Sequence, residues 1–198
     1  MTTDNNKKWR NRKERKELAR RLRSENLILE TFFHLEEMLI ALDCARATNL
    51  PIVATISFRP RLTESTDGHS PAECARRMAG EGAALLGANC EQEPARMLSI
   101  LREMRGAVDI PLAAQPAAFH TTDTTPCFTR LPQFPDDLET IQVARSEFSN
   151  FAAQAKAEGL GFLGGCCGCN AAYIRAMASG LKGGSRLEAT SGAERSSA

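Results

Sequence analysis

The feature that most constrains the fold is a repeated alternation of short apolar segments with longer amphipathic segments. Five apolar segments have the length of strands, at residues 26–30, 51–57, 83–90, 110–115 and 160–163. Segments of helical character follow them, at residues 35–45, from Pro71 onward, and at 94–104, 138–158 and 170–179. Because the strand segments are continuously apolar, both faces of each strand are expected to be buried. Five strand-then-helix units in a row predict a parallel sheet covered by helices, an α/β fold.

This pattern fits two architectures, an open doubly wound sheet and a barrel. In both, ligands bind beyond the carboxyl ends of the strands. The residues found at these ends are Glu30, Ser57, Asn89 with Cys90, Gln115, and Cys166 with Cys167. The carboxyl edge of the sheet is therefore the expected place of a functional site.

The most distinctive motif is Gly164-Gly165-Cys166-Cys167-Gly168, at the exit of the last strand segment. Successive side chains of a regular strand face opposite ways, so two adjacent cysteines converge only where flanking glycines allow other backbone angles. Vicinal thiolates are soft ligands that suit Zn²⁺. Cys90 occupies the equivalent position on a nearby strand, which predicts a three-thiolate zinc site of Cys90, Cys166 and Cys167. The alternative is a closed structural site with Cys169 as a fourth ligand.

Composition and cysteine usage indicate a cytoplasmic protein. Of the 198 residues, 42% are hydrophobic and 25% are charged, which is ordinary for one soluble globular domain. No stretch approaches the roughly 20 apolar residues of a membrane helix, and the first residues are polar, unlike a signal peptide. The odd count of seven cysteines favours reduced thiols or metal ligands over disulfides. Cys44 and Cys74 lie in apolar helical patterns and are expected to be buried.

Two terminal segments differ in composition from the central part, residues 24–182. Residues 1–23 hold ten Lys or Arg against three Asp or Glu, which predicts a basic leader that is helical or disordered. This leader has one aromatic residue and no nucleic-acid-binding motif, so nucleic acid is not an expected partner. In residues 183–198, 11 of 16 are Gly, Ser, Thr or Ala, which predicts a disordered tail. The chain is therefore expected to contain one central domain, with neither a membrane nor a nucleic acid as partner.

Several stretches together resemble the zinc-dependent homocysteine S-methyltransferases, and within that family the betaine-using branch. The most specific are the paired-cysteine motif at 161–168 and the upstream Gly87-Ala88-Asn89-Cys90. The others are residues 29–37, Gln115-Pro116 with His120-Thr121, residues 131–135 and residues 173–176. The likeness extends from about residue 24 to residue 182.

The resemblance implies a (β/α)8 barrel with zinc at its carboxyl rim, held by Cys90, Cys166 and Cys167. Zinc with three protein ligands keeps a fourth position open, and a thiol bound there is deprotonated to the nucleophilic thiolate. The implied reaction is methyl transfer to the thiol of homocysteine, giving methionine, with betaine as the donor. No catalytic residue is implied beyond the metal site.

Two further residues are expected to bind the substrate. Glu30 matches a family glutamate that holds the amino-acid part of homocysteine. A carboxylate at a strand end can receive the substrate's ammonium group in a charge-assisted hydrogen bond. Asn89 is the second candidate and is expected to orient the thiolate loop, although an asparagine here can also serve only to form the turn.

The resemblance covers only part of the family's barrel. A complete barrel of this type needs around 250 residues, whereas residues 24–182 hold five strand-helix units. About the first three units, on the amino-terminal side, are thus expected to be absent, which leaves two unpaired edges. Pairing with a second copy or with a partner chain would cover these edges. The alternative function is therefore a non-catalytic zinc-binding barrel fragment that requires such a partner.

The chain departs from the betaine-using enzymes at the donor site. A quaternary ammonium such as betaine is commonly held by an aromatic cage through cation–π attraction. Thr31 stands where the betaine enzymes place a tyrosine, and the chain has one Trp and one Tyr. Betaine is therefore implied by the likeness and not by visible cage residues.

Overall fold

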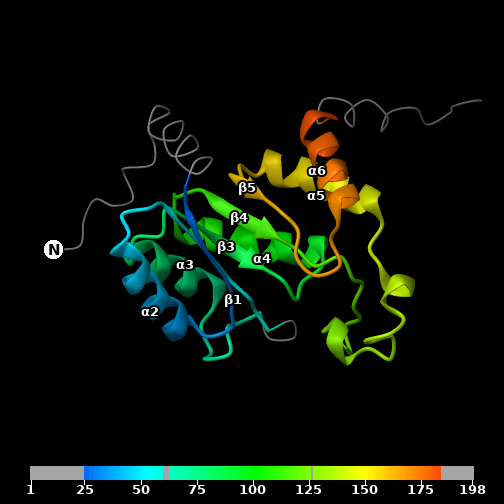
Figure 1. The fold of residues 1–198 in the computed structure, drawn as a ribbon, viewed down its shortest axis with the longest axis horizontal. Helices are drawn as coiled ribbons and strands as arrows, with labels where there is room; N and C mark the ends of the chain where they lie inside the picture. The colour runs from blue at the N-terminus through cyan, green and yellow to red at the C-terminus, as the bar shows by residue number, and fades with distance from the viewer. Residues whose placement is uncertain (1–24, 60–62, 126, 184–198) are drawn as a thin grey trace, which may run out of the picture.

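The computed structural model describes residues 25–59, 63–125 and 127–183, and these form one parallel sheet with its helices (Figure 1). The strands are β1 (Leu27–Phe32), β2 (Ile52–Ile56), β3 (Leu85–Asn89), β4 (Leu112–Gln115) and β5 (Phe162–Leu163). The helices are α2 (Leu35–Arg46), α3 (Pro71–Gly80), α4 (Pro94–Ala107), η2 (Phe128–Arg130), η3 (Leu138–Ile141), α5 (Arg145–Ala157) and α6 (Ala171–Gly183). The five predicted strand-then-helix units are confirmed.

The two terminal segments contribute little to the described structure. The predicted basic leader, residues 1–23, lies outside the described residues, as do residues 184–198 of the predicted tail. Gly183, the first residue of that tail, is instead the last residue of α6.

The strand order distinguishes between the two architectures that fit the sequence. Each strand pairs in parallel with its neighbour in the chain, giving the order β1-β2-β3-β4-β5. A doubly wound sheet reverses this order at a switch point, whereas a barrel keeps its strands in chain order. A hydrogen bond from the amide of Gln115 on β4 to the carboxylate of Glu30 on β1 shows that the sheet is also strongly curved. In a flat sheet these two strands would lie about 14 Å apart. The predicted partial barrel is therefore confirmed.

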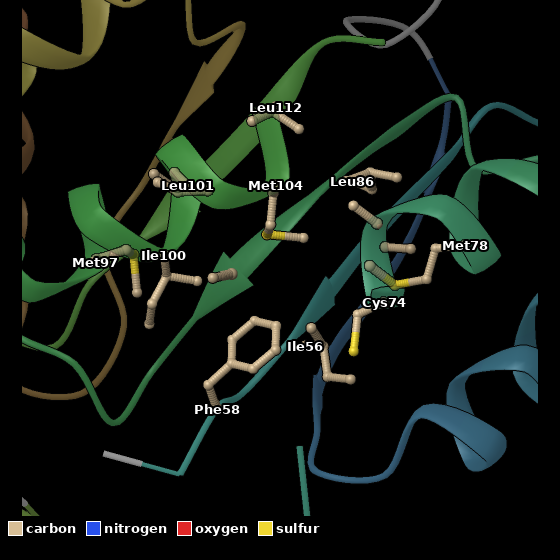
Figure 2. Close-up of a cluster of buried hydrophobic side chains, with 14 of the residues drawn as sticks. Ile56, Phe58, Cys74, Met78, Leu86, Met97, Ile100, Leu101, Met104 and Leu112 are labelled. Carbon is tan, nitrogen blue, oxygen red and sulfur yellow. The ribbon is translucent and has the colours of Figure 1, made fainter. Parts of the chain in front are cut away.

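The main hydrophobic core lies between the outer face of the curved sheet and the helices. In Figure 2, Cys74 and Met78 of α3 and Met97 and Leu101 of α4 pack over strand residues such as Ile56. All five side chains are fully buried. Burial of one large apolar side chain stabilises a fold by about 1.5–3 kcal/mol, so this layer fixes the helices to the sheet. None of the described helices combines the length and the apolar character needed to cross a membrane.

A second, smaller cluster lies on the inner face of the curved sheet. It consists of Val53, Leu85 and Ala113, with Phe162 packed against it, so that β2, β3, β4 and β5 contribute one residue each. This cluster contains strand residues alone among those described, which places the helices on the outer face, as in a barrel. Ile28 on β1 pairs with Val53 but is 46% exposed, because β1 forms the edge of the described sheet.

The predicted helix at 138–158 is wrong at its beginning. The structure has the short 3-10 helix η3, then an extended segment, and only then α5. The break arises because the backbone N–H of Val143 donates to the carbonyl of Ala118 (2.9 Å) instead of continuing a helix. This pairing buries the Val143 side chain, and Glu147 accepts a hydrogen bond from the backbone just before α5. A tertiary contact therefore overrides the local helix preference.

The two cysteines that were expected to be buried differ in their exposure. Cys74 is fully buried, as predicted, but Cys44 is exposed. The buried stripe of α2 consists of Leu35, Met38, Leu42 and Ala45. Cys44 lies off this stripe and therefore faces outward, so the prediction of its burial is wrong.

Asp67, in the connection between β2 and α3, closes the amino-terminal end of α2. His34, the residue immediately before α2, makes no side-chain hydrogen bond that caps this helix. Instead the Asp67 carboxylate accepts hydrogen bonds from the backbone N–H groups of Leu35 (3.0 Å) and Glu36 (3.1 Å). Burial alone would raise the pKa of Asp67, but the hydrogen bonds from Ser65 and from these two amides outweigh it and lower the pKa to about 2. The ionised carboxylate therefore stabilises the folded state.

Asp67→Asn is expected to lower the free energy of unfolding by about 1–2 kcal/mol at pH 7. The folded pKa of about 2 lies below the ordinary value of 3.8, so this contribution is present above pH 4 and is lost as the pH falls toward 2. Urea unfolding at pH 7 and at pH 2.5 would measure the difference between variant and parent. Asp136→Asn, at an exposed position, is the control and should stay within about 0.5 kcal/mol. A difference that grows on acidification would contradict the assignment.

Gly87→Ala is expected to destabilise the sheet, because β3 and β4 approach too closely at this point for a side chain. A Cβ at position 87 would lie 1.9 Å from the carbonyl oxygen of Ala113. We expect a loss of about 1–3 kcal/mol in urea unfolding. Gly106→Ala in α4 is the matched control, since a Cβ there meets nothing within 4 Å, and it should be neutral or stabilising by up to about 1 kcal/mol. Equal midpoints for the two variants would refute the packing argument.

Candidate metal centre

Three cysteine thiols converge where β3 and β5 end. Cys90 directly follows β3, and Cys166 and Cys167 lie in the turn after β5. Their Sγ atoms all lie within 4.8 Å of one another, and those of Cys90 and Cys167 are 3.4 Å apart. Cys90 is buried, Cys166 is half-buried and Cys167 is exposed, so the cluster is open on one side. The structure thus brings together the three cysteines that the sequence singled out.

The segment that leaves β4 positions both cysteine loops. The carbonyl of Gln115 accepts a hydrogen bond from the backbone N–H of Cys90 (2.9 Å). The carbonyl of Pro116 accepts one from the N–H of Cys166 (2.9 Å), and the N–H of Ala118 donates to the carbonyl of Cys167 (2.8 Å). Backbone groups of one short segment therefore fix all three thiols relative to one another.

Backbone conformation turns the thiols toward each other. Cys90 has a φ of 59°, in the left-handed region that residues with a side chain rarely adopt. Gly168 has a φ of 79°, and a Cβ there would lie 2.6 Å from the ring of Phe119. Glycine is therefore required at the end of the paired-cysteine turn, both for its backbone angle and for the approach of the aromatic ring.

The pKa values of the three thiols shift in different directions. A hydrogen bond with Cys90 lowers the pKa of the Cys166 thiol to about 6. The same contact, together with burial, raises the pKa of Cys90, and burial raises that of Cys167. Since a metal binds thiolates, metal uptake at this cluster has to release the protons that Cys90 and Cys167 hold.

Cys169 does not join the cluster. Its thiol donates instead to the carbonyl of Pro116 at 3.7 Å, and the described ligand group comprises Cys90, Cys166 and Cys167 alone. The structure thus gives no support to the closed four-thiolate site.

Asn89 links the cluster to β1. Its side chain is 1% exposed, accepts a hydrogen bond from the Thr31 N–H (2.9 Å) and donates to the Thr31 hydroxyl (2.7 Å). The same amide nitrogen lies 3.9 Å from the Sγ of Cys166. Asn89 therefore contacts a cluster thiol from a fixed orientation. The hydrogen bonds between Asn89 and Thr31 could not be predicted from the sequence.

Glu30 lies on β1 beside this contact, and its side chain is exposed. Its carboxylate accepts a hydrogen bond from the Gln115 amide at 3.3 Å. The sequence placed Gln115 at a strand end but indicated no role for it. In the structure Gln115 pairs in register with Asn89, which places it next to the cysteine cluster. His120 is half exposed and bonds to Glu93 (3.1 Å), which is consistent with a surface loop and not with metal ligation.

The sulfur cluster fits a tetrahedral metal ion. Zinc–sulfur bonds of about 2.3 Å in a tetrahedron place sulfurs about 3.8 Å apart. The observed spacing of up to 4.8 Å, with one pair at 3.4 Å, lies close to that value. Three soft sulfur donors suit zinc, and three ligands leave a fourth position for a further group.

Comparison with known sequences identifies the family. Residues 10–181 match the family described as Homocysteine S-methyltransferase. The chain belongs to the homocysteine S-methyltransferase family. This confirms the resemblance inferred from the cysteine motifs, and the three-cysteine cluster is consistent with the zinc site of that family.

Individual relatives match over part of their length. Betaine–homocysteine S-methyltransferase 1 of Mus musculus is 34% identical over 161 residues, which are 78% of this chain and 39% of the relative. The protein of the same name from Danio rerio is 36% identical over 78% of this chain and 40% of its own length. S-methylmethionine–homocysteine S-methyltransferase BHMT2 of Pongo abelii is 33% identical over 78% of this chain and 44% of its own length. The chain thus spans about two fifths of these relatives.

Solved structures share the fold. The apo form of the homocysteine methyltransferase MmuM from Escherichia coli superposes with a TM-score of 0.58 at 19% identity, over 79% of this chain and 50% of that one. Its metallated form gives a TM-score of 0.56 at 19% identity, over 78% and 44% of the two chains. At this identity the likeness establishes the fold alone.

The purified chain is expected to bind one zinc ion, and Cys90→Ser is expected to lose nearly all of it, because two sulfur ligands remain. Metal content would be measured by atomic emission after purification under reducing conditions. Cys169→Ser and Cys44→Ser are the matched controls, since neither thiol belongs to the cluster, and both should keep the parent's content. Loss of zinc from Cys169→Ser would instead support the four-thiolate site.

Proposed function

We propose that this chain carries the zinc- and homocysteine-binding part of a homocysteine S-methyltransferase, and that it serves methyl transfer to the homocysteine thiol to give methionine. The observation that carries this proposal is the convergence of three Sγ atoms within 4.8 Å at the carboxyl edge of the barrel-type sheet. Membership in the family supports the substrate class. Thiolate ligands must stay reduced, which supports a cytoplasmic location.

The residues at this edge would have separate roles. Cys90, Cys166 and Cys167 would hold zinc as three thiolates, and three protein ligands would leave room for a further ligand such as the substrate thiol. Zinc bound there would lower the pKa of a thiol ligand, so that the substrate sulfur is a thiolate at neutral pH. Asn89 would keep Cys166 oriented through the amide contact at 3.9 Å. Glu30 would accept a hydrogen bond from the substrate's ammonium group.

The transfer itself is a displacement at carbon. The substrate sulfur forms a bond to the methyl carbon while the bond from that carbon to the cationic atom of the donor breaks. The electron pair of the broken bond stays with the donor, which thereby loses its positive charge. The sulfur becomes a thioether, so the product of homocysteine is methionine.

Betaine is the proposed donor because of the likeness to betaine–homocysteine S-methyltransferases. The name of another relative points to S-methylmethionine as a second candidate. Tyr173 does not offer its ring to a cationic donor, because it is 4% exposed and its hydroxyl donates to the carbonyl of Val143 (2.7 Å). Assays therefore need both donors.

A second candidate function is a zinc-binding barrel fragment that acts only with a second copy or a partner chain. It is favoured by the edges of the sheet. Within the described residues β1 pairs only with β2, and β5 only with β4. A barrel closes by pairing its first and last strands, so these edges need further strands.

The decisive assay is methionine formation by the chain incubated with zinc, homocysteine and either betaine or S-methylmethionine, followed by mass spectrometry. We expect methionine from the parent chain and only the background rate from Cys166→Ala, because that variant loses a zinc ligand. Cys169→Ala, outside the cluster, should keep the parent rate. Retained zinc and activity in Cys166→Ala would refute the three-thiolate assignment.

The same assay separates the two candidate functions. One bound zinc without methionine from either donor would favour the partner-dependent fragment. Sedimentation of the zinc-loaded chain would then show whether a second copy completes it.

A further inference from the structure

Gln115 lies between the metal cluster and Glu30. It is the last residue of β4, is 9% exposed and stands in register with Asn89. Its backbone carbonyl accepts a hydrogen bond from the N–H of Cys90. Its side-chain amide donates a hydrogen bond to Glu30 on β1, across the curved sheet. One residue thus contacts both the loop of a cluster thiol and the carboxylate expected to bind substrate.

The hydrogen bond to Glu30 fixes the orientation of the Gln115 amide. An ionised carboxylate only accepts hydrogen bonds, so the amide nitrogen has to face it, at the observed 3.3 Å. The amide oxygen must then point elsewhere. This oxygen is buried and, within the described residues, finds no hydrogen-bond partner. A buried acceptor without a donor is costly, so a donor is expected when the site is filled.

The chemistry around this oxygen favours an ammonium group. Glu30 contributes negative charge and acceptor oxygens, and the Gln115 oxygen adds a neutral acceptor. An ammonium group has three N–H donors and no acceptor, so it can bond to both side chains at once. The cluster lies close by, because Thr31 next to Glu30 bonds to Asn89, which contacts the thiol of Cys166.

We propose that Gln115 is a further specificity-determining residue, whose amide oxygen accepts a hydrogen bond from the α-ammonium group that the proposed function already assigns to Glu30. This inference rests on the proposed function and adds to it the residue that selects amino-acid thiols over simple thiols. The amide nitrogen of Gln115 donates a hydrogen bond to the Glu30 carboxylate, and its amide oxygen accepts a hydrogen bond from the ammonium group.

The test compares two thiols that differ only in the ammonium group. Homocysteine and 4-mercaptobutyrate would be titrated by calorimetry into the zinc-loaded chain of all 198 residues. The parent is expected to bind homocysteine at least about tenfold more tightly. Gln115→Leu should reduce this ratio about tenfold, with unchanged zinc content and unchanged affinity for 4-mercaptobutyrate. Gln154→Leu, the same change at an exposed position on α5, should leave the ratio as in the parent.

The possible outcomes distinguish this inference from the proposed function. If the parent binds both thiols equally, or Gln115→Leu keeps the parent ratio, the role of Gln115 is overturned while thiol binding at zinc stands. If neither thiol binds the zinc-loaded parent, the proposed function fails, and the inference fails with it. Gln115→Met, which keeps an unbranched side chain without hydrogen bonds, repeats the test should Gln115→Leu lose zinc. Loss of zinc from both variants would make Gln115 a structural residue and overturn the proposal.

Discussion

The arrangement of the site depends on the backbone of the segment that leaves β4. The carbonyls of Gln115 and Pro116 accept hydrogen bonds from Cys90 and Cys166, two residues far apart in the chain. Backbone groups at a buried strand end must be paired, and these are paired with the two loops that carry thiols. The hydrogen bonds that pair these backbone groups therefore also set the spacing of the sulfurs.

Curvature of the sheet is the second condition for the site. In a flat sheet the side chains of β1 and β4 would not meet, yet Glu30 and Gln115 are hydrogen-bonded. Gly87 allows β3 and β4 to approach closely on the inner face, because a Cβ there would lie 1.9 Å from the carbonyl oxygen of Ala113. The described helices pack on the outer face, and the cluster on the inner face consists of strand side chains. Fold and site thus share one cause, which is the closing of the sheet toward a barrel.

Much of this arrangement could be predicted from the sequence, because the informative signals are local. Continuous apolar runs mark the strands, and residues placed just after them, such as Cys90 and Cys166, lie at the same edge of any parallel sheet. The break at Val143 could not be predicted, since it depends on pairing with Ala118. The role of Asp67 as a cap from another loop is likewise absent from any local pattern. The partner of the Gln115 amide depends on curvature, which the sequence does not encode at any single position.

The short length of β5 has a consequence for folding. This strand has two residues and two paired positions with β4, against four paired positions between β3 and β4, so its backbone pairing adds little stability. Cys90 and Cys167 are 77 positions apart in the chain, and closing a loop of that length costs conformational entropy. An ion that binds both cysteines only in the folded chain would repay this cost and hold the last strand in place. A metal bound there would therefore also act as a structural cross-link between the loop that follows β3 and the loop that follows β5.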